Sequence, residues 1–369
     1  MGRLRRPTRT CFPALLPGFQ VHFLFMNIGS HELAGRAFAA PMAGLTDAPF
    51  RRLCRRLGAA YAVGEMTGSD PRLQASTKTR RRLRIDSDEP PVAVQLAGAD
   101  AGMLADAARR CADLGAQVID INMGCPAKKV CAVASGSALL RDEPLVGRIL
   151  DAVVAASPVP VTLKMRTGWD RSQRNAVRVA RMAEAAGVRM LAVHGRTRAC
   201  GFGGSAEYET IGQVRASVRI PVVANGDIDS PGKARDVLAS TGADAVMVGR
   251  AALERPWIFG QIEHLLRHGT TPAEPGILSL RPMLLDLFDD HYRHYGEDAG
   301  VRTARKRVHW LMRRVEGGEG FCAEFHALED SASQRERLDA FLLESAGRSP
   351  TFRYRDGAGC ENEEGCGQQ

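Results

Sequence analysis

Cys125 is the residue whose position in the sequence suggests chemistry most directly. It ends the segment Asn122-Met123-Gly124-Cys125, which follows the apolar run Val118–Ile121. That run is typical of a buried β-strand, so the thiol is expected just beyond the carboxyl end of a strand. In a parallel α/β barrel, catalytic side chains gather at this edge. A thiol there can hold a proton and deliver it to a substrate carbon. Cys125 taken alone would favour a small buried hydrophobe, because free cysteine is among the most buried residue types.

Other polar residues end further apolar runs and suit a flavin. Lys164 is predicted to point from a strand end toward the barrel mouth, where a buried ammonium needs an anionic partner such as a reduced flavin. Gln95 offers an amide that can both donate to and accept from an isoalloxazine edge. The turn Pro41-Met42-Ala43-Gly44 supplies backbone close to a flat ring. Gln95 alone is more often a satisfied polar group, and the turn alone is a weak signal.

A phosphate site is predicted at the other side of the same edge. Gly226 and the pair Gly249-Arg250 follow the predicted seventh and eighth strands. Barrels often bind phosphate at that place through backbone N–H groups and a helix N-terminus. Arg250 adds a guanidinium that can bind phosphate oxygens in a bidentate manner. This combination is more specific for phosphate than for FMN. No G-x-G-x-x-G motif follows the first strand, so a Rossmann dinucleotide site is not indicated.

The elements that must position these residues alternate along the chain. Eight apolar runs are predicted as strands: Ala37–Pro41, Tyr61–Glu65, Val92–Leu96, Val118–Asn122, Val161–Met165, Met190–His194, Val222–Asn225 and Ala245–Val248. Helix-like segments lie between them, and several end at a Gly that can act as a helix C-cap. Eight such units predict a (β/α)8 TIM barrel. A doubly wound sheet is the alternative, but it would concentrate special residues at one switch point instead of after nearly every strand.

Domain boundaries follow from changes in composition. Residues 1–25 are expected to be either a disordered extension or the result of a start codon assigned too far upstream. A more regular sequence pattern begins at Met26. Residues 26–270 form the predicted FMN-binding barrel, and Pro272–Pro282 is predicted as a linker. Residues 271–346 are predicted to be a small all-helical domain, with helices at Met283–Tyr295, Gly300–Val315 and Glu336–Ser345. Residues 347–369 are predicted to be a disordered tail.

Composition sets broad limits on partners and compartment. The chain has 44% hydrophobic and 25% charged residues, as ordinary soluble domains do, and a formal net charge of +8. That charge favours a polyanionic partner without identifying it. The nine cysteines form no C-x-x-C pair, which predicts reduced thiols in a cytoplasmic protein and no metal site. No stretch reaches the ~20 apolar residues of a membrane span.

The ordered set of motifs resembles the tRNA-dihydrouridine synthases, and the bacterial B type in particular. It comprises Ala40–Gly44, Asn122–Pro126, Lys164–Arg166, His194–Thr197, Asn225–Asp227 and Gly249-Arg250, within residues 26–346. The resemblance implies an FMN barrel and a helical RNA-binding domain. It also implies reduction of the C5–C6 bond of a D-loop uridine in tRNA, with NADPH or NADH as reductant.

The same resemblance implies roles for individual residues. Cys125 would protonate C5 after hydride passes from the reduced flavin to C6. The flavin ring would contact Pro41, Met42, Ala43, Gln95 and Lys164. His194 would lie near the cofactor or the uracil. The phosphate would be held by Asn225, Gly226, Asp227, Gly249 and Arg250, and Asn122 would lie near the uracil. The residues Cys131-Ala132-Val133 depart from the family pattern, so no contact is carried over to them.

A tRNA substrate calls for basic surfaces that bind phosphates. Arg302, Arg305 and Lys306 share one face of a predicted helix, and the run 79–84 is a second candidate. Solvated charged faces are the alternative for both. We expect a monomer. Two other functions stay open: an FMN barrel acting on free pyrimidines, and a non-catalytic RNA-binding barrel. A nucleophilic Cys125 with His194 as base is a minor alternative to the proton donor.

Overall fold

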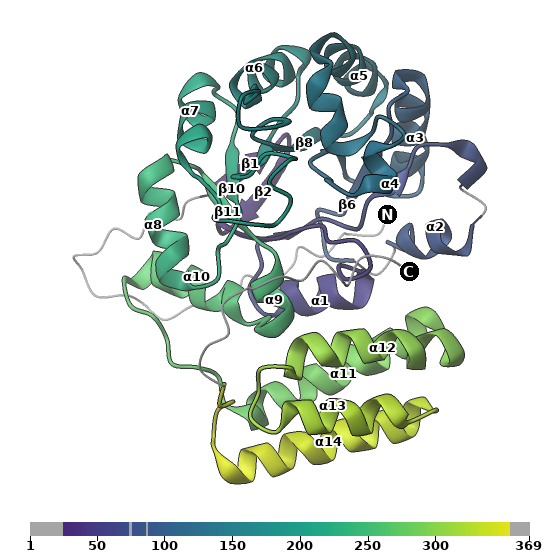
Figure 1. Ribbon diagram of the computed structural model, residues 1–369, viewed down its shortest axis with the longest axis vertical. Helices are drawn as coiled ribbons and strands as arrows, with labels where there is room; N and C mark the ends of the chain where they lie inside the picture. The colour runs from purple at the N-terminus through teal and green to yellow at the C-terminus, as the bar shows by residue number, and fades with distance from the viewer. Residues whose placement is uncertain (1–24, 74–75, 86–87, 355–369) are drawn as a thin grey trace, which may run out of the picture.

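A parallel β-barrel forms the larger part of the computed structural model, which describes residues 25–73, 76–85 and 88–354 (Figure 1). Its strands are β3 (Ala37–Ala39), β4 (Tyr61–Ala62), β5 (Thr67–Gly68), β6 (Ala93–Ala97), β7 (Val118–Met123), β8 (Val161–Arg166), β9 (Leu191–His194), β10 (Val222–Asn225) and β11 (Ala245–Val248). All of their pairings are parallel. The ring closes because β11 pairs with β3, β3 with β4, and Val63 bridges Ala93 of β6. The predicted TIM barrel is confirmed, with its second strand divided into β4 and β5.

Helices follow the strands along the chain and lie around the barrel (Figure 1). They are α1 (Ala48–Arg56), α2 (Thr77–Arg82), α3 (Ala101–Asp113), α4 (Lys128–Cys131), α5 (Glu143–Ala156), α6 (Ala176–Ala186), α7 (Glu209–Ser217), α8 (Pro231–Thr241), α9 (Arg250–Glu254) and α10 (Ile258–His268), with short 3-10 turns at Pro71–Leu73 and Gly136–Arg141. Asp47, Asp100 and Ser230 cap α1, α3 and α8 with their side chains. Such caps satisfy N–H groups at the first turn, which have no partner within the helix. None of the helices in the described ranges is long and apolar enough to cross a membrane.

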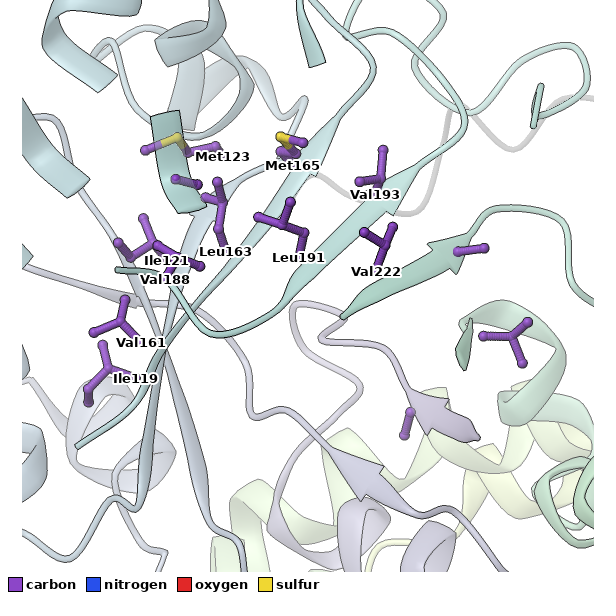
Figure 2. Packing of buried hydrophobic residues seen from close by; sticks show 14 of the residues in the cluster. Ile119, Ile121, Met123, Val161, Leu163, Met165, Val188, Leu191, Val193 and Val222 are labelled. Atoms are coloured by element: carbon purple, nitrogen blue, oxygen red, sulfur yellow. The ribbon is translucent and has the colours of Figure 1, made fainter. Parts of the chain in front are cut away.

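Strand alternation decides which side chains reach the barrel interior. In β7 and β8 the odd-numbered residues pack toward the helices, as Ile119, Ile121 and Leu163 show (Figure 2). Because successive side chains point to opposite faces, the even-numbered residues turn inward. Asp120 and Lys164 are among them, and both are buried. The period of two therefore separates an apolar outer core from a polar interior.

An antiparallel hairpin closes the amino-terminal end of the barrel. β1 (Phe25–Ile28) and β2 (His31–Ala34) pair around a turn in which Gly29 has φ +60°. The inward residues Ile28 and Leu33 form one apolar cluster with Phe38 and Val118 at the strand starts. The polar end of the interior therefore opens only at the carboxyl edge, which we call the barrel mouth. The predicted extension ended at residue 25, but Phe25 already belongs to β1; residues 1–24 lie outside the described part of the chain.

A four-helix group follows the barrel and packs beside α1 and α9 (Figure 1). It consists of α11 (Ile277–Tyr295), α12 (Glu297–Met312), α13 (Gly318–Ala327) and α14 (Ser331–Arg348). Its core contains Phe288, Phe321 and Phe341, and the rings of Phe321 and Phe341 stack at 4.2 Å between centroids. The helical character expected for this region is present.

The helices of this group differ in their bounds from the sequence prediction. α11 begins at Ile277 and contains Pro282, so the predicted linker is too long. The first turns of the helix form despite the proline because Leu280 and Leu284 pack into the core of the helical group. α13 was not predicted, because the glycines around its start hide the pair Phe321 and Phe325.

The predicted disordered tail also begins too early. Arg348 still belongs to α14, the carbonyl of Pro350 accepts a hydrogen bond from Ile277, and Phe352 stacks on Trp257 at 6.0 Å between centroids. Burial of the aromatic ring therefore orders the chain as far as residue 354. Residues 355–369 are outside the described ranges.

A buried ion pair joins the two domains. Asp47, at the start of α1, accepts a hydrogen bond of 2.6 Å from Arg307 of α12 and one of 3.1 Å from the hydroxyl of Tyr295. Both members of the pair are under 10% exposed. Burial alone would raise the pKa of Asp47, but the Arg307 guanidinium and His291 hold it well below its usual range. The first strand-to-helix loop of the barrel is thereby fixed to the helical domain.

Replacing Arg307 by Met should lower the free energy of unfolding by about 3–5 kcal/mol, because it leaves the Asp47 carboxylate buried without its cation. Urea denaturation followed by circular dichroism measures this change. Arg302→Met is the matched control: Arg302 is exposed on the same helix, and its substitution should cost within ~0.5 kcal/mol. Equal stability of the two variants would show that the buried pair does not hold the domains together.

Candidate functional site

A chain of hydrogen bonds runs across the inward faces of β6, β7 and β8. Thr162 donates to Asp120 at 2.6 Å, Gln95 donates to Asp120 at 2.7 Å, and Asn122 donates to the Gln95 side-chain oxygen at 2.7 Å. The side-chain oxygen of Asn122 then accepts from the backbone N–H of Cys125 at 3.0 Å. The buried Asp120 carboxylate therefore helps to fix the Cys125 loop through Gln95 and Asn122.

These hydrogen bonds give two predicted site residues roles that differ from the expected ones. The Gln95 side-chain oxygen accepts from Asn122, and one N–H of its amide donates to Asp120. The second N–H of the amide can therefore donate to a ligand. Asn122 was expected near the uracil; its side chain is buried and holds the Cys125 loop. Asp120 was not predicted as a site residue. Burial raises its pKa, opposed by hydrogen bonds from Thr162 and Gln95.

Lys164 places an ammonium in the same interior layer. Its Nζ donates to the side-chain oxygen of Asn225 at 3.0 Å, and Asn225 in turn donates to the carbonyl of Met247 at 2.7 Å. An ammonium has three N–H donors, so this one can bind a further anionic or carbonyl group. Burial and the nearby Arg166 lower the pKa of Lys164 to about 8. Asn225, predicted to hold a phosphate, here orients the lysine.

The Cys125 thiol lies half-buried at the rim of this layer. Its carbonyl accepts hydrogen bonds from the backbone and the hydroxyl of Ser137, at 3.0 and 2.8 Å, which fix the loop from its other side. Burial raises the pKa of the thiol, although the backbone at Ala127 and the cations Arg166 and Lys164 oppose that shift. The sulfur therefore carries its proton at neutral pH, as an acid must.

Arg166 links the loops on either side of the thiol and was not assigned a role from the sequence. Its Nε donates to the carbonyl of Gly124 at 2.8 Å, and its Nη1 donates to the carbonyls of Thr197 and Gly201 at 2.8 and 2.7 Å. Only 1% of its surface is exposed. The alternation that turns Lys164 inward also turns Arg166 inward, and this is the signal that could have identified it.

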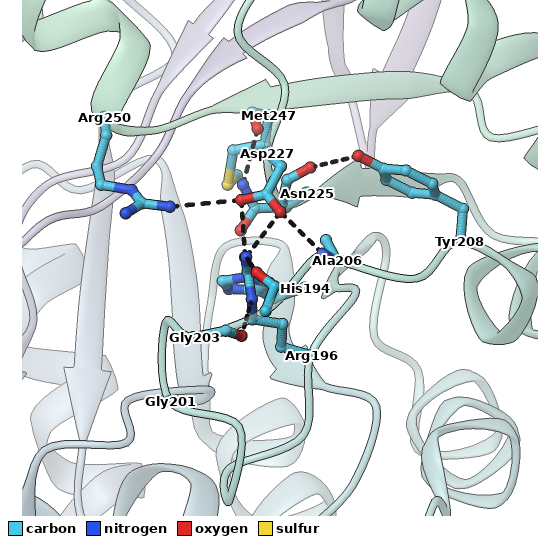
Figure 3. Close-up of polar contacts among 12 residues, drawn as sticks. His194, Arg196, Gly201, Gly203, Ala206, Tyr208, Asn225, Asp227, Met247 and Arg250 are labelled. Carbon is cyan, nitrogen blue, oxygen red and sulfur yellow. Dashed lines mark hydrogen bonds and ion pairs between the residues drawn. The ribbon is translucent and has the colours of Figure 1, made fainter. Parts of the chain in front are cut away.

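A second arginine, Arg196, organises the loop after β10 (Figure 3). It forms a bidentate ion pair with Asp227, at 2.8 and 2.7 Å, while Arg250 approaches the same carboxylate at 3.4 Å. The backbone N–H of Ala206 also donates to Asp227. Burial would raise the pKa of Asp227, but its bonds with Arg196 keep it lowered. A carboxylate repels phosphate, so this geometry suits Asp227 to positioning Arg250.

Of the two glycines predicted for the phosphate site, Gly226 leaves less room for a side chain than Gly249 does. Gly226 has φ +120°, and an added Cβ would lie 2.8 Å from the Cβ of Ala206. Gly249 precedes α9. A Cβ added to it would lie 3.7 Å from the sulfur of Met42, which is an ordinary van der Waals contact. Gly249 of the last strand end and Met42 of the first strand end therefore adjoin. The half-exposed Arg250 opens α9 beside them.

His194 ends β9 at the barrel mouth and is neutral. Burial lowers its pKa well below the usual value, and the charges of Lys164 and Arg166 act in the same direction. Its Nε2 lies 3.4 Å from Arg196. A neutral imidazole offers a donor and an acceptor to a ligand without adding charge. Burial raises the pKa of the Cys125 thiol, so the pKa shifts of both groups oppose a thiolate–imidazolium pair.

The loop after β3, which contains Pro41–Gly44, brings backbone groups to the barrel mouth. Pro41 and Met42 are half-buried, Ala43 and Gly44 are exposed, and the N–H of Gly44 donates to Glu65 at 2.7 Å. A Cβ on Gly44 would lie 3.5 Å from the Nζ of Lys306 on α12. The predicted flavin-contact turn and one predicted RNA contact are therefore neighbours.

The other basic residues are distributed differently from the prediction. Arg302 and Arg305 line a shallow hollow together with Asp298 and Glu329, whereas Lys306 faces the barrel rim. In the run 79–84, Arg81 and Arg84 donate to carbonyls of Tyr295 and His294 in α11. That run contacts the helical domain and leaves fewer free cations for RNA.

Known proteins that are similar to this chain indicate its family. A family model described as "Dihydrouridine synthase (Dus)" matches residues 38–346. The chain belongs to the dihydrouridine synthase family. A tRNA-dihydrouridine synthase B of Pseudomonas aeruginosa is 55% identical over 320 residues, covering 86% of this chain and 96% of that protein. One of Vibrio cholerae with the same name is 48% identical over 317 residues, covering 86% and 98%.

Solved structures of low sequence identity share the barrel alone. The 6-hydroxypseudooxynicotine amine oxidase of Pseudomonas geniculata has a TM-score of 0.51 at 16% identity, covering 72% of this chain and 52% of that one. A 2-naphthoyl-CoA reductase has a TM-score of 0.50 at 12% identity, covering 66% and 52%. As a dihydrouridine synthase, this protein is a flavin-dependent oxidoreductase. Within the described ranges, no group of three or more His, Cys, Asp or Glu side chains could hold a metal.

Iodoacetamide at neutral pH should alkylate Cys200 before Cys125. The thiolate is the reactive form, and a hydrogen bond with the Thr197 hydroxyl lowers the pKa of Cys200, whereas burial raises that of Cys125. Peptide mass spectrometry over a time course measures both rates. The buried Cys54 should stay unmodified in the folded protein and reports unfolding. Faster labelling of Cys125 would mean that it is a thiolate and not a proton donor.

Proposed function

We propose that the protein reduces the C5–C6 double bond of a D-loop uridine in tRNA, with bound FMN, NADPH or NADH as reductant, and Cys125 as the proton donor to C5. The observation that carries this proposal is geometric: hydrogen bonds hold the Cys125 loop at the barrel mouth, and the Lys164 ammonium is buried in the adjoining inward layer. The relatives named tRNA-dihydrouridine synthase B support tRNA as substrate.

The residues at the mouth fit a flavin mononucleotide. Lys164 and the remaining N–H of Gln95 suit the polar edge of the ring, and the backbone at Pro41–Ala43 suits its flat face. Arg250 and the backbone at Gly226 and Gly249 suit the phosphate. When bound, FMN supplies the hydride that reduces the uracil ring.

The protein then has two tasks, to orient the uracil and to protonate it. The bonds from Asn122 and Ser137 fix the Cys125 loop from both sides, so the thiol is held in one place. Loss of the proton leaves a thiolate near Arg166 and Lys164, and both cations favour that charge. The proton transfer is therefore supported electrostatically without a pre-formed thiolate. No bond between sulfur and substrate is required.

Cys125→Ala should retain bound flavin and its reduction by NADPH, but lose reoxidation of the flavin by unmodified tRNA by about 100-fold or more, a typical loss for a general acid. Anaerobic stopped-flow absorbance separates the two half-reactions. Cys131→Ala is the matched control, because its sulfur lies on the same loop, 3.7 Å from the Cys125 carbonyl. Loss of flavin from Cys125→Ala would assign the thiol a structural role. Reoxidation of wild-type flavin by free uridine as readily as by tRNA would favour the small-molecule barrel.

Removing the charges of Arg302 and Lys306 should weaken tRNA binding and reduce its salt dependence. Each lost phosphate contact lowers the magnitude of the slope of log K against log [salt] by about one. Binding is measured for the double variant Arg302→Gln/Lys306→Gln across a salt series, with flavin absorbance as a check of the site. Arg181→Gln, exposed on α6 at the far side from the helical domain (Figure 1), should leave the slope unchanged. An unchanged slope in the double variant would remove this helix face from the RNA interface.

A further inference from the structure

The loop after β9 carries a phenyl ring in an unusual place. Phe202 is 60% exposed, and the glycines Gly201, Gly203 and Gly204 surround it. Gly201 and Gly204 have φ +56° and +62°, a conformation that favours glycine. The flanking residues add no side chains that could cover the ring. A large apolar group is thus held in solvent at the barrel mouth.

The loop backbone is nevertheless firmly tethered. Arg166 donates to the carbonyl of Gly201 at 2.7 Å, and Arg196 donates to the carbonyls of Gly203 and Gly204, one of which is visible in Figure 3. Both guanidinium groups are at least 95% buried. Two buried arginines therefore fix the backbone on both sides of Phe202. Its exposure is a feature of an ordered loop.

The ring faces groups already assigned to the site. Its centroid lies 6.4 Å from the His194 ring, 5.3 Å from the Arg166 guanidinium and 5.8 Å from that of Arg250. Packing within this chain covers less than half of the phenyl surface, so the fold does not use most of its apolar area. A flat ligand at the mouth could cover it.

Arg166 also relates this ring to the thiol. The same guanidinium binds the carbonyl of Gly124, next to Cys125, and that of Gly201, next to Phe202. One rigid, planar group thereby sets the spacing between the acid loop and the phenyl loop. A planar substrate that receives a proton from Cys125 would lie between these two loops.

We propose that Phe202 is a substrate-binding residue whose ring packs against the uracil extruded from the tRNA. A base taken out of its stack loses its neighbours, and an aromatic side chain can replace them. The proposal rests on the proposed function, because it assumes a uracil at the mouth. It assigns to Phe202 the oxidative half-reaction and no part in reduction of the flavin by NADPH.

The test measures both half-reactions in Phe202→Ala, Phe202→Leu and Phe202→Tyr, each purified with its flavin. Phe202→Ala should slow tRNA-dependent reoxidation at low tRNA concentration by about 10- to 100-fold, the range of one lost base–aromatic stack. Phe202→Tyr keeps the ring and should stay within about 3-fold of wild type on the same scale. Phe202→Leu keeps apolar bulk without an aromatic face and should fall between them. Flavin content and the rate of reduction by NADPH should not change in any variant.

Phe25→Ala is the matched control, since Phe25 is 50% exposed in the hairpin at the opposite end of the barrel. It should behave as wild type. Equal reoxidation rates in wild type and Phe202→Ala would overturn the proposal. A loss of flavin, or a matching loss in reduction by NADPH, would also overturn it by assigning the ring to the cofactor. Failure of the wild-type flavin to reoxidise with tRNA would instead refute the proposed function itself.

Discussion

The inward layer of polar side chains at the barrel mouth is the constraint on which the site depends. Parallel strands alternate their side chains, and the sequence places apolar residues at the outward positions of β7 and β8. The inward positions near the carboxyl edge are then forced into a common interior. Buried polar groups are costly unless they are hydrogen-bonded, and here each finds its partner on the next strand, from Thr162 through Asp120 and Gln95 to Asn122. The Cys125 loop inherits its position from that requirement.

The charges at the barrel mouth are mainly positive. Lys164, Arg166 and Arg196 are all buried, while Asp120 and Asp227 are the nearby carboxylates. Burial and mutual repulsion lower the pKa values of Lys164 and His194. An anionic ligand would relieve this repulsion and stabilise the charged lysine. The same field favours the thiolate that remains once Cys125 has given up its proton. In the proposed reaction, cofactor binding and proton donation would therefore depend on the same cations.

Much of the fold follows from the sequence because it is encoded by local periodicity. The eight apolar runs and the glycines after the helices were sufficient for the barrel, and Cys125 and Lys164 could be placed at strand ends. Pairings between strands could not be read in this way: nothing near Gln95 indicates that Asp120 and Asn122 use most of its amide. Asp47 and Arg307 are 260 positions apart, and only the packed structure brings them together. The helix α13 was hidden because its glycines outweigh two phenylalanines in any local pattern.

The contact between Asp47 and Arg307 also fixes the position of residues at the barrel mouth. Asp47 begins α1 directly after the loop that contains Pro41–Gly44, and Arg307 is the neighbour of Lys306 on α12. The buried pair therefore fixes the same short stretch of barrel that lines the mouth and the same turn of helix that presents a cation to it. Since Lys306 lies beside Gly44, a tRNA bound as proposed across the helical domain would meet the barrel at a set distance from Cys125. Under the proposed function, one loop would couple substrate orientation to flavin contact, and a shift of the helical domain would displace both.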